Sequence, residues 1–201
     1  MYDFEDTELC RLIQEEARQN KNWFVSTELD SDGHLQRIFW MDPTQKTLYR
    51  HYHDVVFYNN PFREDLFDMT FYILFVVDAQ GKSRLVGFSL VTTELAEDHS
   101  WILRQLLKAN KTKHPGVIIV DEDPEVEAAC NEVIPRSNRL ISLWHLVTWI
   151  KANLHGALTV GWTEFLSVFW TARNSITQQI FESRWKETVA VLVDDEPSAQ
   201  A

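Results

Sequence analysis

The sequence predicts an α/β fold on a mixed sheet, in which three antiparallel strands are followed by two helix-linked parallel strands. The chain has 201 residues, 45% of them hydrophobic, which is enough for one sizeable core. Apolar segments at 54–58, 70–78 and 84–92 follow one another without an intervening helical pattern, as in an antiparallel meander. Two further apolar segments, 116–121 and 138–143, alternate with helical patterns, which is typical of parallel crossovers.

Before this core, the sequence predicts a helix, a hairpin and a second helix. Apolar residues recur at helical spacing over 7–18, which predicts the first helix. Two strand-like segments within 23–41 flank the polar, glycine-containing "DSDG", a hairpin connection. Asp42 and Pro43 then provide an N-cap and a first helical residue, so a helix is expected to begin there.

Within the core, the connections also have local signals. Residues 78–83, "DAQGKS", form a turn between the second and third strands. A helix is expected over about 96–110, and Asp123 with Pro124 opens the next one. The fifth strand leads into the helical segment "LWHLVTWIKANL", and the tail over 162–189 is also helical.

This order of elements describes an RNase H-like sheet with additions at both ends. No internal repeat or low-complexity linker interrupts it. The expected divisions are an N-terminal helix, hairpin and helix over 1–52, the RNase H-like domain over 53–193, and a frayed tail over 194–201.

Charge and cysteine content exclude several classes of protein. The net charge is −11, which argues against a tight, non-specific grip on nucleic acid by this domain. Cys10 and Cys130 are too few for a disulfide framework or a zinc cage, which indicates a reducing compartment. The acidic start "MYDFEDTELC" is no signal peptide, and the run "FYILFVV" is too short to span a membrane. We therefore expect an intracellular protein without a membrane partner.

Two predicted strands end in polar residues where open α/β sheets place their sites. Asn59 follows "VVFY", and Asp121 follows "VIIV". Two-metal phosphoryl transfer needs several carboxylates around a pair of cations, so Asp121 is a candidate metal ligand. Asp123 is expected to act only as a helix cap, and Glu122 is expected to be solvated. No G-x-G-x-x-G, Walker, H-E-x-x-H or G-x-S-x-G motif is present.

Five segments together resemble the Mutator-like (MULE) transposases, with the fungal versions closest. They run in order and at approximately the family's spacing across residues 35–190. The resemblance implies an RNase H-like core with an Asp–Asp–Glu triad that binds two Mg²⁺ or Mn²⁺ ions and cuts and joins DNA at transposon ends. The segments are "LQRIFWMDPTQ", "HDVVFYNNPFREDLFDM", "GVIIVDEDPEVEAACNEVIP", "SLWHL" and "ARNSITQQIFESRW".

Carried over by residue, the resemblance implies an altered triad. The first aspartate corresponds to Asn59, the second to Asp121, and the glutamate to Glu182 in "FESRW". Glu187 and Glu164 remain alternatives for the third acid. An amide oxygen lacks the charge that holds Mg²⁺ against its hydration shell, so the metal site and cleavage are expected to be impaired.

The same family has a Cys-x-x-His element after the fifth strand, and here only half of it is kept. His145 is retained, but Ser142 stands where the cysteine belongs. Zinc binding is therefore disfavoured, and a packed or capped histidine is the simpler interpretation. Two other groups of side chains also have simple structural interpretations. Trp144, Trp149 and Trp162 are expected in the core. A solvated helix end is expected to carry Lys111, Lys113, Arg104 and Lys108.

Three functions follow as hypotheses. The first is a transposase domain with a compromised metal site, acting on DNA, nuclear in location and multimeric by resemblance. The second is a domesticated or degenerate module that binds DNA or protein without cleaving. The third is an RNase H-like nuclease in which Asp65 or Asp68 replaces the missing acid; Asp54 lies about 16 Å from the strand end, too far to do so.

Overall fold

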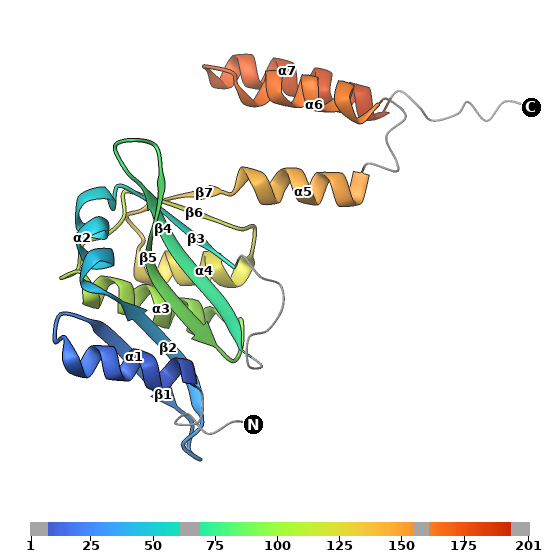
Figure 1. The fold of residues 1–201 in the computed structure, drawn as a ribbon. Coiled ribbons are helices and arrows are strands. Elements are labelled where there is room, and N and C mark those ends of the chain that lie inside the picture. The colour runs from blue at the N-terminus through green and yellow to red at the C-terminus, as the bar shows by residue number, and fades with distance from the viewer. Residues whose placement is uncertain (1–7, 61–68, 155–160, 194–201) are drawn as a thin grey trace, which may run out of the picture. The chain divides into compact units, whose positions relative to one another are not determined.

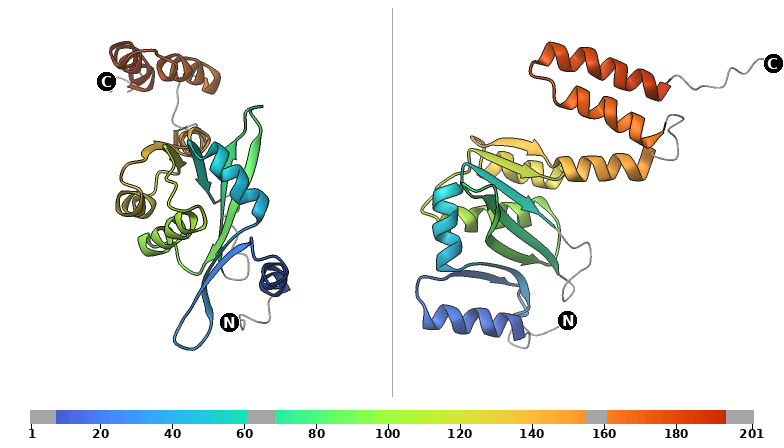
Figure 2. Two further views of the ribbon diagram at one scale, coloured as in Figure 1. Left: turned by 90° about the vertical axis from the view of Figure 1, so that its left-hand side faces the viewer. Right: turned by 45° about the horizontal axis from the view of Figure 1, so that its top comes forward.

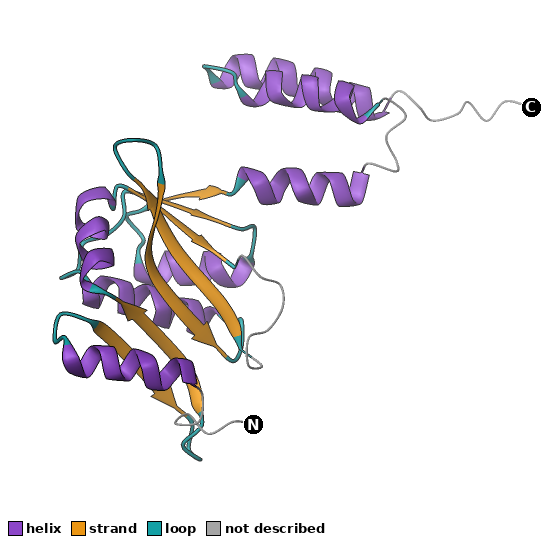
Figure 3. Ribbon diagram, in the orientation of Figure 1, coloured by secondary structure: helices purple, strands orange, loops and turns teal. Residues whose placement is uncertain are grey.

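A computed structural model describes residues 8–60, 69–154 and 161–193, and these form two compact units, Met1–Leu146 and Val147–Ala201. Figure 1 shows the elements in chain order, and Figure 3 separates helices from strands. The tail expected at 194–201 lies outside the described residues.

The first unit is built on a seven-stranded sheet in the order β1-β2-β5-β4-β3-β6-β7. β3, β4 and β5 pair antiparallel, whereas β6 pairs parallel with β3 and with β7. The predicted mixed α/β sheet, with a meander followed by two parallel strands, is therefore confirmed. The strands are β1 (Phe24–Leu29), β2 (Leu35–Met41), β3 (Val55–Asn59), β4 (Thr70–Val77), β5 (Ser83–Val91), β6 (Val117–Val120) and β7 (Asn138–Ile141).

The N-terminal hairpin belongs to this sheet and is not a separate addition. β2 pairs antiparallel with β5, with Trp40 opposite Phe88, so the sheet continues through β2 to β1. Aromatic stacking supports this junction. The ring centroids of Trp40 and Phe88 are 5.4 Å apart, and those of Phe88 and Phe71 are 5.9 Å apart. The sequence pattern predicted the hairpin, but it did not predict that β2 pairs with β5.

Helices cover both faces of the sheet. Alternate side chains of β2 enter two cores: Phe39 and Met41 pack in the larger one, and Ile38 and Trp40 in the smaller one, which also contains Ile13. Figure 2 shows α3 and α4 on one side of the sheet and α1 on the other. These helices are α1 (Glu8–Gln19), α3 (Ala96–Ala109) and α4 (Pro124–Val133).

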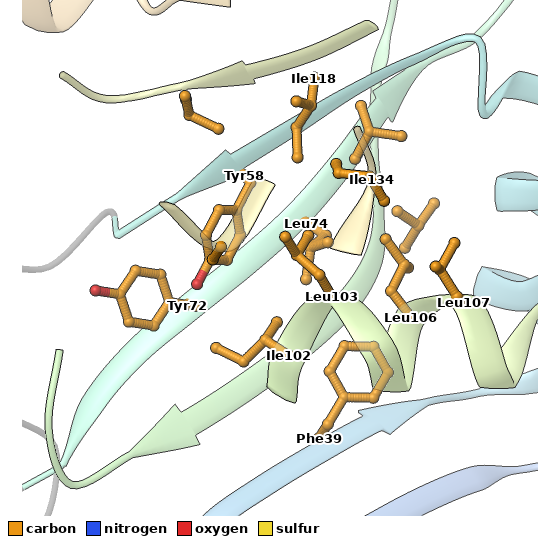
Figure 4. Packing of buried hydrophobic residues seen from close by; sticks show 14 of the residues in the cluster. Phe39, Tyr58, Tyr72, Leu74, Ile102, Leu103, Leu106, Leu107, Ile118 and Ile134 are labelled. Atoms are coloured by element: carbon orange, nitrogen blue, oxygen red, sulfur yellow. The ribbon is translucent and has the colours of Figure 1, made fainter. Parts of the chain in front are cut away.

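The larger core joins α3 to the middle of the sheet. Side chains of β3 and β4, among them Tyr58, Tyr72 and Leu74, meet Ile102 and Leu103 of α3, as Figure 4 shows. Leu74, Ile102 and Leu103 are fully buried. A buried aliphatic side chain of this size contributes about 1.5–3 kcal/mol by leaving water, so this contact fixes where α3 lies.

Local capping signals correctly located two helix starts. α2 (Pro43–Tyr52) begins with a complete capping box, in which Asp42 accepts from the Gln45 amide and Gln45 accepts from the Asp42 amide. α4 begins at Pro124, with Asp123 accepting from the Glu125 amide at 2.8 Å. Both carboxylates satisfy amide groups that the helix itself leaves without a partner.

The second unit contains a pair of helices where the sequence indicated one helical tail. α5 (Leu143–Leu154) ends the first unit and continues into the second. α6 (Trp162–Arg173) ends at Asn174, and α7 (Gln178–Val193) then packs against it through Thr188, whose hydroxyl contacts the Val168 carbonyl at 3.4 Å. No helix in the described part of the chain is long and apolar enough to cross a membrane.

A buried carboxylate anchors the start of α3 to β2. Asp98 is 1% exposed and accepts from Arg37 Nε at 2.5 Å, from the Thr93 hydroxyl, and from the Leu95 amide at 3.1 Å. Arg37 also contacts Glu28 and Glu97, which are more exposed. The Asp98 charge is thus both paired and hydrogen bonded, which a buried carboxylate requires.

Removing Asp98 should therefore destabilise the first unit strongly. Asp98→Ala leaves the Arg37 guanidinium, 14% exposed, without its closest partner, and we expect a loss of about 3 kcal/mol in the free energy of unfolding. Glu28→Ala removes a half-exposed partner of the same arginine and should cost under about 1 kcal/mol. Urea unfolding followed by tryptophan fluorescence measures both. Equal losses for the two variants would contradict this role of Asp98.

Candidate functional site

A cavity of about 300 Å³ opens where β3, β5 and β6 end. It is the crevice that open α/β sheets use for ligands, at the carboxyl ends of parallel strands. Among the described residues, three carboxylates and one imidazole line it, and no lysine or arginine does. These lining residues are Tyr58, Asn60, Tyr72, Glu94, Asp121, Asp123, Val126 and His145.

Asp121 enters the cavity directly from the end of β6, as the sequence predicted. Its Oδ1 contacts Nδ1 of His145 near the start of α5. Nδ1 of His145 also lies 3.0 Å from the Ser142 hydroxyl, so the serine that replaces the family's cysteine remains beside the histidine. The His145 imidazole therefore limits the orientations that the Asp121 carboxylate can adopt.

Glu94 is a second acid of the cavity, and the sequence analysis missed it. It follows β5 by three residues and accepts from the Thr70 hydroxyl at 2.8 Å. Tyr72 hydrogen bonds to the same side chain. A signal was present, because "LVTTE" places an acid just beyond an apolar strand, but only the strand order shows that β5 ends beside β3 and β6.

Asp123 has two roles where the sequence indicated one. It caps α4, as expected, and its side chain also lines the cavity beside Asp121. Glu122 between them is exposed, which confirms its predicted solvated position. The expectation that Asp123 is only a cap was therefore too narrow.

Asn59 is not among the residues that line the cavity. Tyr58 packs toward α3, and side chains alternate along a strand, so the Asn59 carboxamide points to the opposite face of the sheet. Its Oδ1 is buried and has no hydrogen-bond partner in the described residues. The neighbouring Asn60 reaches the cavity instead.

The predicted third acid belongs to the second unit. Glu182 lies on the exposed surface of α7 and accepts from Gln178 Nε2 at 2.8 Å. Glu187, on the same helix, and Glu164, on α6, are also exposed. The meeting of Asn59, Asp121 and Glu182 in one site stays a prediction. Asp65 and Asp68, the alternative acids, lie outside the described residues.

Two tyrosines and a buried histidine form the inner wall of the cavity. The Tyr58 hydroxyl and Nδ1 of His99 are hydrogen bonded at 2.7 Å, and the Tyr72 ring meets the His99 ring edge-on at 5.2 Å. Burial, followed by the nearby Glu94 and Asp123 carboxylates, raises the pKa of Tyr72. Tyr72 therefore remains a neutral hydrogen-bond donor toward Glu94.

The donors of the cavity suit a hydrated divalent cation in kind, but they are not gathered as a cage. Carboxylate and amide oxygens are ligands that Mg²⁺ and Mn²⁺ accept, and Mg²⁺ commonly keeps several waters beside one or two carboxylates. In the described residues, the one trio of ionisable side chains with ligand atoms within 4.8 Å of one another is Asp30, Asp32 and His34. That trio forms the β1–β2 turn, where Asp30 accepts from the amides of the other two.

The expected core position of two tryptophans is wrong. Trp144 is 70% exposed and Trp149 is 60% exposed. Trp144 meets the His145 ring edge-on at 4.7 Å, so this exposed ring stands beside a residue of the cavity. The apolar pattern of α5 did not distinguish a covered face from an uncovered one.

The stability of the first unit should fall in mild acid because His99 is buried. Burial lowers the pKa of His99 from 6.5, against the opposing charges of Asp123, Asp98 and Glu94. The unfolded chain then binds more protons, so the stability conferred by neutral His99 is present above about pH 6.5 and is lost as the pH falls through the lower, folded pKa. We expect the pH dependence of unfolding below about pH 7 to weaken in His99→Gln and to persist in His51→Gln, where the histidine is exposed. Unchanged pH dependence in His99→Gln would contradict this assignment.

Comparisons with known proteins agree with part of the sequence reading. Residues 55–148 match the MULE transposase domain. Protein FAR1-RELATED SEQUENCE 6 of Arabidopsis thaliana is 26% identical over 82% of this chain and 22% of its own length. Protein FAR-RED IMPAIRED RESPONSE 1 of the same plant is 24% identical over 86% of this chain and 21% of its own length.

The chain thus spans about a fifth of the length of these relatives. Their source is a plant, and the expected likeness to fungal versions stays a prediction. One similar solved structure is the cryoEM structure of a simian T-cell lymphotropic virus intasome in complex with PP2A regulatory subunit B56 gamma. A chain of it is 11% identical to this chain, and the match covers 66% of this chain and 47% of the length of that chain. Its TM-score of 0.32 is too low to support an assignment of fold. The resemblance to MULE transposases is confirmed for residues 55–148.

Proposed function

We propose that the chain is a MULE transposase-derived domain of RNase H-like fold, in which an acidic cavity holds a divalent cation for work on DNA and cleavage is impaired. The observation that carries the proposal is the meeting of Glu94, Asp121 and Asp123 in one cavity at the carboxyl ends of β5 and β6. The match over residues 55–148 includes β3 through β7 and therefore the whole frame of this cavity.

The cation would be held mainly by Asp121. Its carboxylate is oriented by His145 and ends a rigid, buried strand, which limits its movement. Glu94 and Asp123 add negative charge around the same space and would hold water molecules of the hydrated ion. A bound Mg²⁺ or Mn²⁺ would polarise a phosphodiester and lower the pKa of a water molecule.

Impairment follows from the two amides at the end of β3. Asn59 carries no charge and its side chain lies on the face of the sheet away from the cavity, and Asn60, which does line the cavity, is also an amide. Two-metal sites hold their cations about 3.5–4 Å apart, whereas the ligand atoms of the three cavity carboxylates do not all lie within 4.8 Å of one another. The cavity therefore supports weak binding of one cation better than a two-metal reaction.

A second candidate function has its own observation. Glu94 lines the cavity beside Asp121, so it could replace the missing acid in an RNase H-like nuclease. This places the substitute acid after β5, whereas the sequence reading looked for it at Asp65 or Asp68. A module that binds DNA or protein without cleaving remains the outcome if no variant cleaves. Nuclear location and multimer formation are parts of the proposal that the resemblance supports.

Nicking of supercoiled DNA in Mn²⁺ separates these functions. We expect negligible nicking by the wild type, a gain in Asn60→Asp, and loss of that gain in Asn60→Asp/Asp121→Ala. Asn60 lines the cavity, so a carboxylate there adds charge that the amide lacks, whereas Asn59→Asp places the charge on the opposite face of the sheet and should not restore nicking. Robust wild-type nicking that disappears in Glu94→Gln would overturn the impairment and favour the substitute acid. Absence of nicking in every variant would overturn the broken-triad account.

Binding of Mn²⁺ tests the cavity without requiring cleavage. Asp121→Asn should weaken Mn²⁺ binding at least about tenfold, because it removes the charge of the ligand at the strand end. Glu122→Gln is the matched control: it makes the same change in charge one residue away, at an exposed side chain, and should bind as the wild type does. Electron paramagnetic resonance of free Mn²⁺ gives both affinities. Equal affinities in the two variants would remove Asp121 from the site.

A further inference from the structure

A basic patch lies at the end of the sheet opposite the acidic cavity. Residues 43–53 and 99–120 contain no Asp or Glu, although the whole chain has 30 acidic residues. The first segment forms α2, and the second contains the loop between α3 and β6. We define the basic patch by its four cations, Lys46, Arg50, Lys111 and Lys113.

Direct contacts bring the two segments together. Nζ of Lys113 donates to the Arg50 carbonyl at 3.1 Å, and the Tyr49 hydroxyl donates to the Lys113 carbonyl at 2.9 Å. Tyr49 is fully buried, so it fastens the loop to α2. Gly116 completes the junction, because a Cβ there would lie 3.0 Å from the Asp54 carbonyl just before β3. The basic patch is therefore a fixed part of the first unit.

The loop also holds two residues in an uncommon backbone conformation. Lys111 and Thr112 have φ values of 55° and 61°, in the left-handed region that a β-branched residue rarely adopts. The Thr112 amide donates to the Leu107 carbonyl at 2.8 Å, which ends α3 and retains this turn. Strained backbone of this kind persists where the surrounding structure fixes it, and here it presents Lys111 and Lys113 at the surface.

These cations lack the carboxylate partner that four arginines of the first unit have. Arg37, Arg84, Arg104 and Arg139 each contact an Asp or Glu. None of the four cations of the basic patch makes an ion pair within the residues that the structure describes. Burial, together with the positive charges of Arg50 and Lys111, lowers the pKa of Lys46. Concentrated like charge without a partner destabilises a fold unless an anion is bound there.

We propose that the basic patch binds the phosphate backbone of duplex DNA at a site separate from the cavity. Lysine and arginine side chains on a helix and an adjoining loop supply the phosphate contacts that position proteins on a duplex. β3 separates the basic patch from the cavity by about 16 Å at 3.3 Å per residue. Because the acidic side chains of the cavity lie at one end of the sheet and the basic patch lies at the other, a chain with a net charge of −11 can still contact DNA.

The surroundings of the basic patch favour a polar polyanion over a membrane or an apolar partner. No large hydrophobic side chain within 43–53 or 108–116 is among the exposed ones, and both segments are fully described. Membrane-surface segments need buried apolar side chains in addition to charge. Thr47, Thr112 and His51 are among the exposed neighbours, and hydroxyl and imidazole groups also contact phosphates.

The test measures binding of the full chain to a fluorescent random-sequence duplex in EDTA. Under these conditions no divalent cation is bound and no cleavage occurs. The result therefore does not depend on whether the cavity binds a cation or cleaves DNA. Lys111→Glu/Lys113→Glu and, separately, Lys46→Glu/Arg50→Glu should each weaken DNA binding at least about tenfold. Each should also reduce the dependence of log K on log salt by about 2, because two phosphate contacts are lost.

The matched control is Lys151→Glu/Lys186→Glu, which makes the same change in net charge at exposed lysines of the second unit. It should bind DNA with nearly the wild-type affinity and salt dependence. Thermal unfolding of all three variants verifies that each remains folded. Equal DNA binding by the control and by both folded patch variants would overturn the proposal.

Vesicles of phosphatidylcholine and phosphatidylserine are the second probe. We expect that the basic patch does not bind these vesicles, so the charge-reversal variants of the basic patch should bind them to the same extent as the wild type. If the wild type binds these vesicles through the basic patch and does not bind the duplex, the partner is a lipid surface and the assignment to DNA is wrong.

Discussion

The contact between Arg37 and Asp98 holds the two halves of the first unit in register. Arg37 comes from β2, in the hairpin half, and Asp98 comes from the first turn of α3, which covers the central strands. Because Asp98 is buried, its charge must be satisfied, and only one position of α3 allows Arg37, Thr93 and the Leu95 amide to reach it. The residue after Asp98 is His99, so the same anchor sets the inner wall of the cavity.

The cavity depends on this arrangement more than on any single acid. His99 supports Tyr58, and the tyrosines in turn close the space in which Glu94, Asp121 and Asp123 meet. The ends of β5 and β6 and the cap of α4 thereby concentrate negative charge at one place, which Val126 and the aromatic rings also line. Such a site favours cations, and its carboxylates are spread too widely to form a closed cage of ligands.

Charge is distributed along the strand direction of the first unit. The acidic cavity lies at the carboxyl ends of β3 and β6, and the basic patch lies before their amino ends. A strongly acidic protein can therefore still present a local surface that favours phosphates, because screening in physiological salt limits the reach of each charged group to about 8 Å. Net charge describes how the whole molecule behaves at long range, but it does not describe either end of this sheet.

The sequence by itself determined the local elements. Alternation of apolar residues located the strands within a residue or two, and Asp42 and Asp123 marked helix starts because side-chain capping depends only on neighbours in the chain. It also placed Asp121 at a strand end. Only the tertiary structure decided that Glu94 reaches the cavity, that Asn59 faces away from it, that Trp144 is exposed, and that Lys46 and Lys113 lie on one surface. Those facts depend on strand order, on the parity of side chains across paired strands, and on contacts between residues more than 60 positions apart, none of which is encoded in a local pattern.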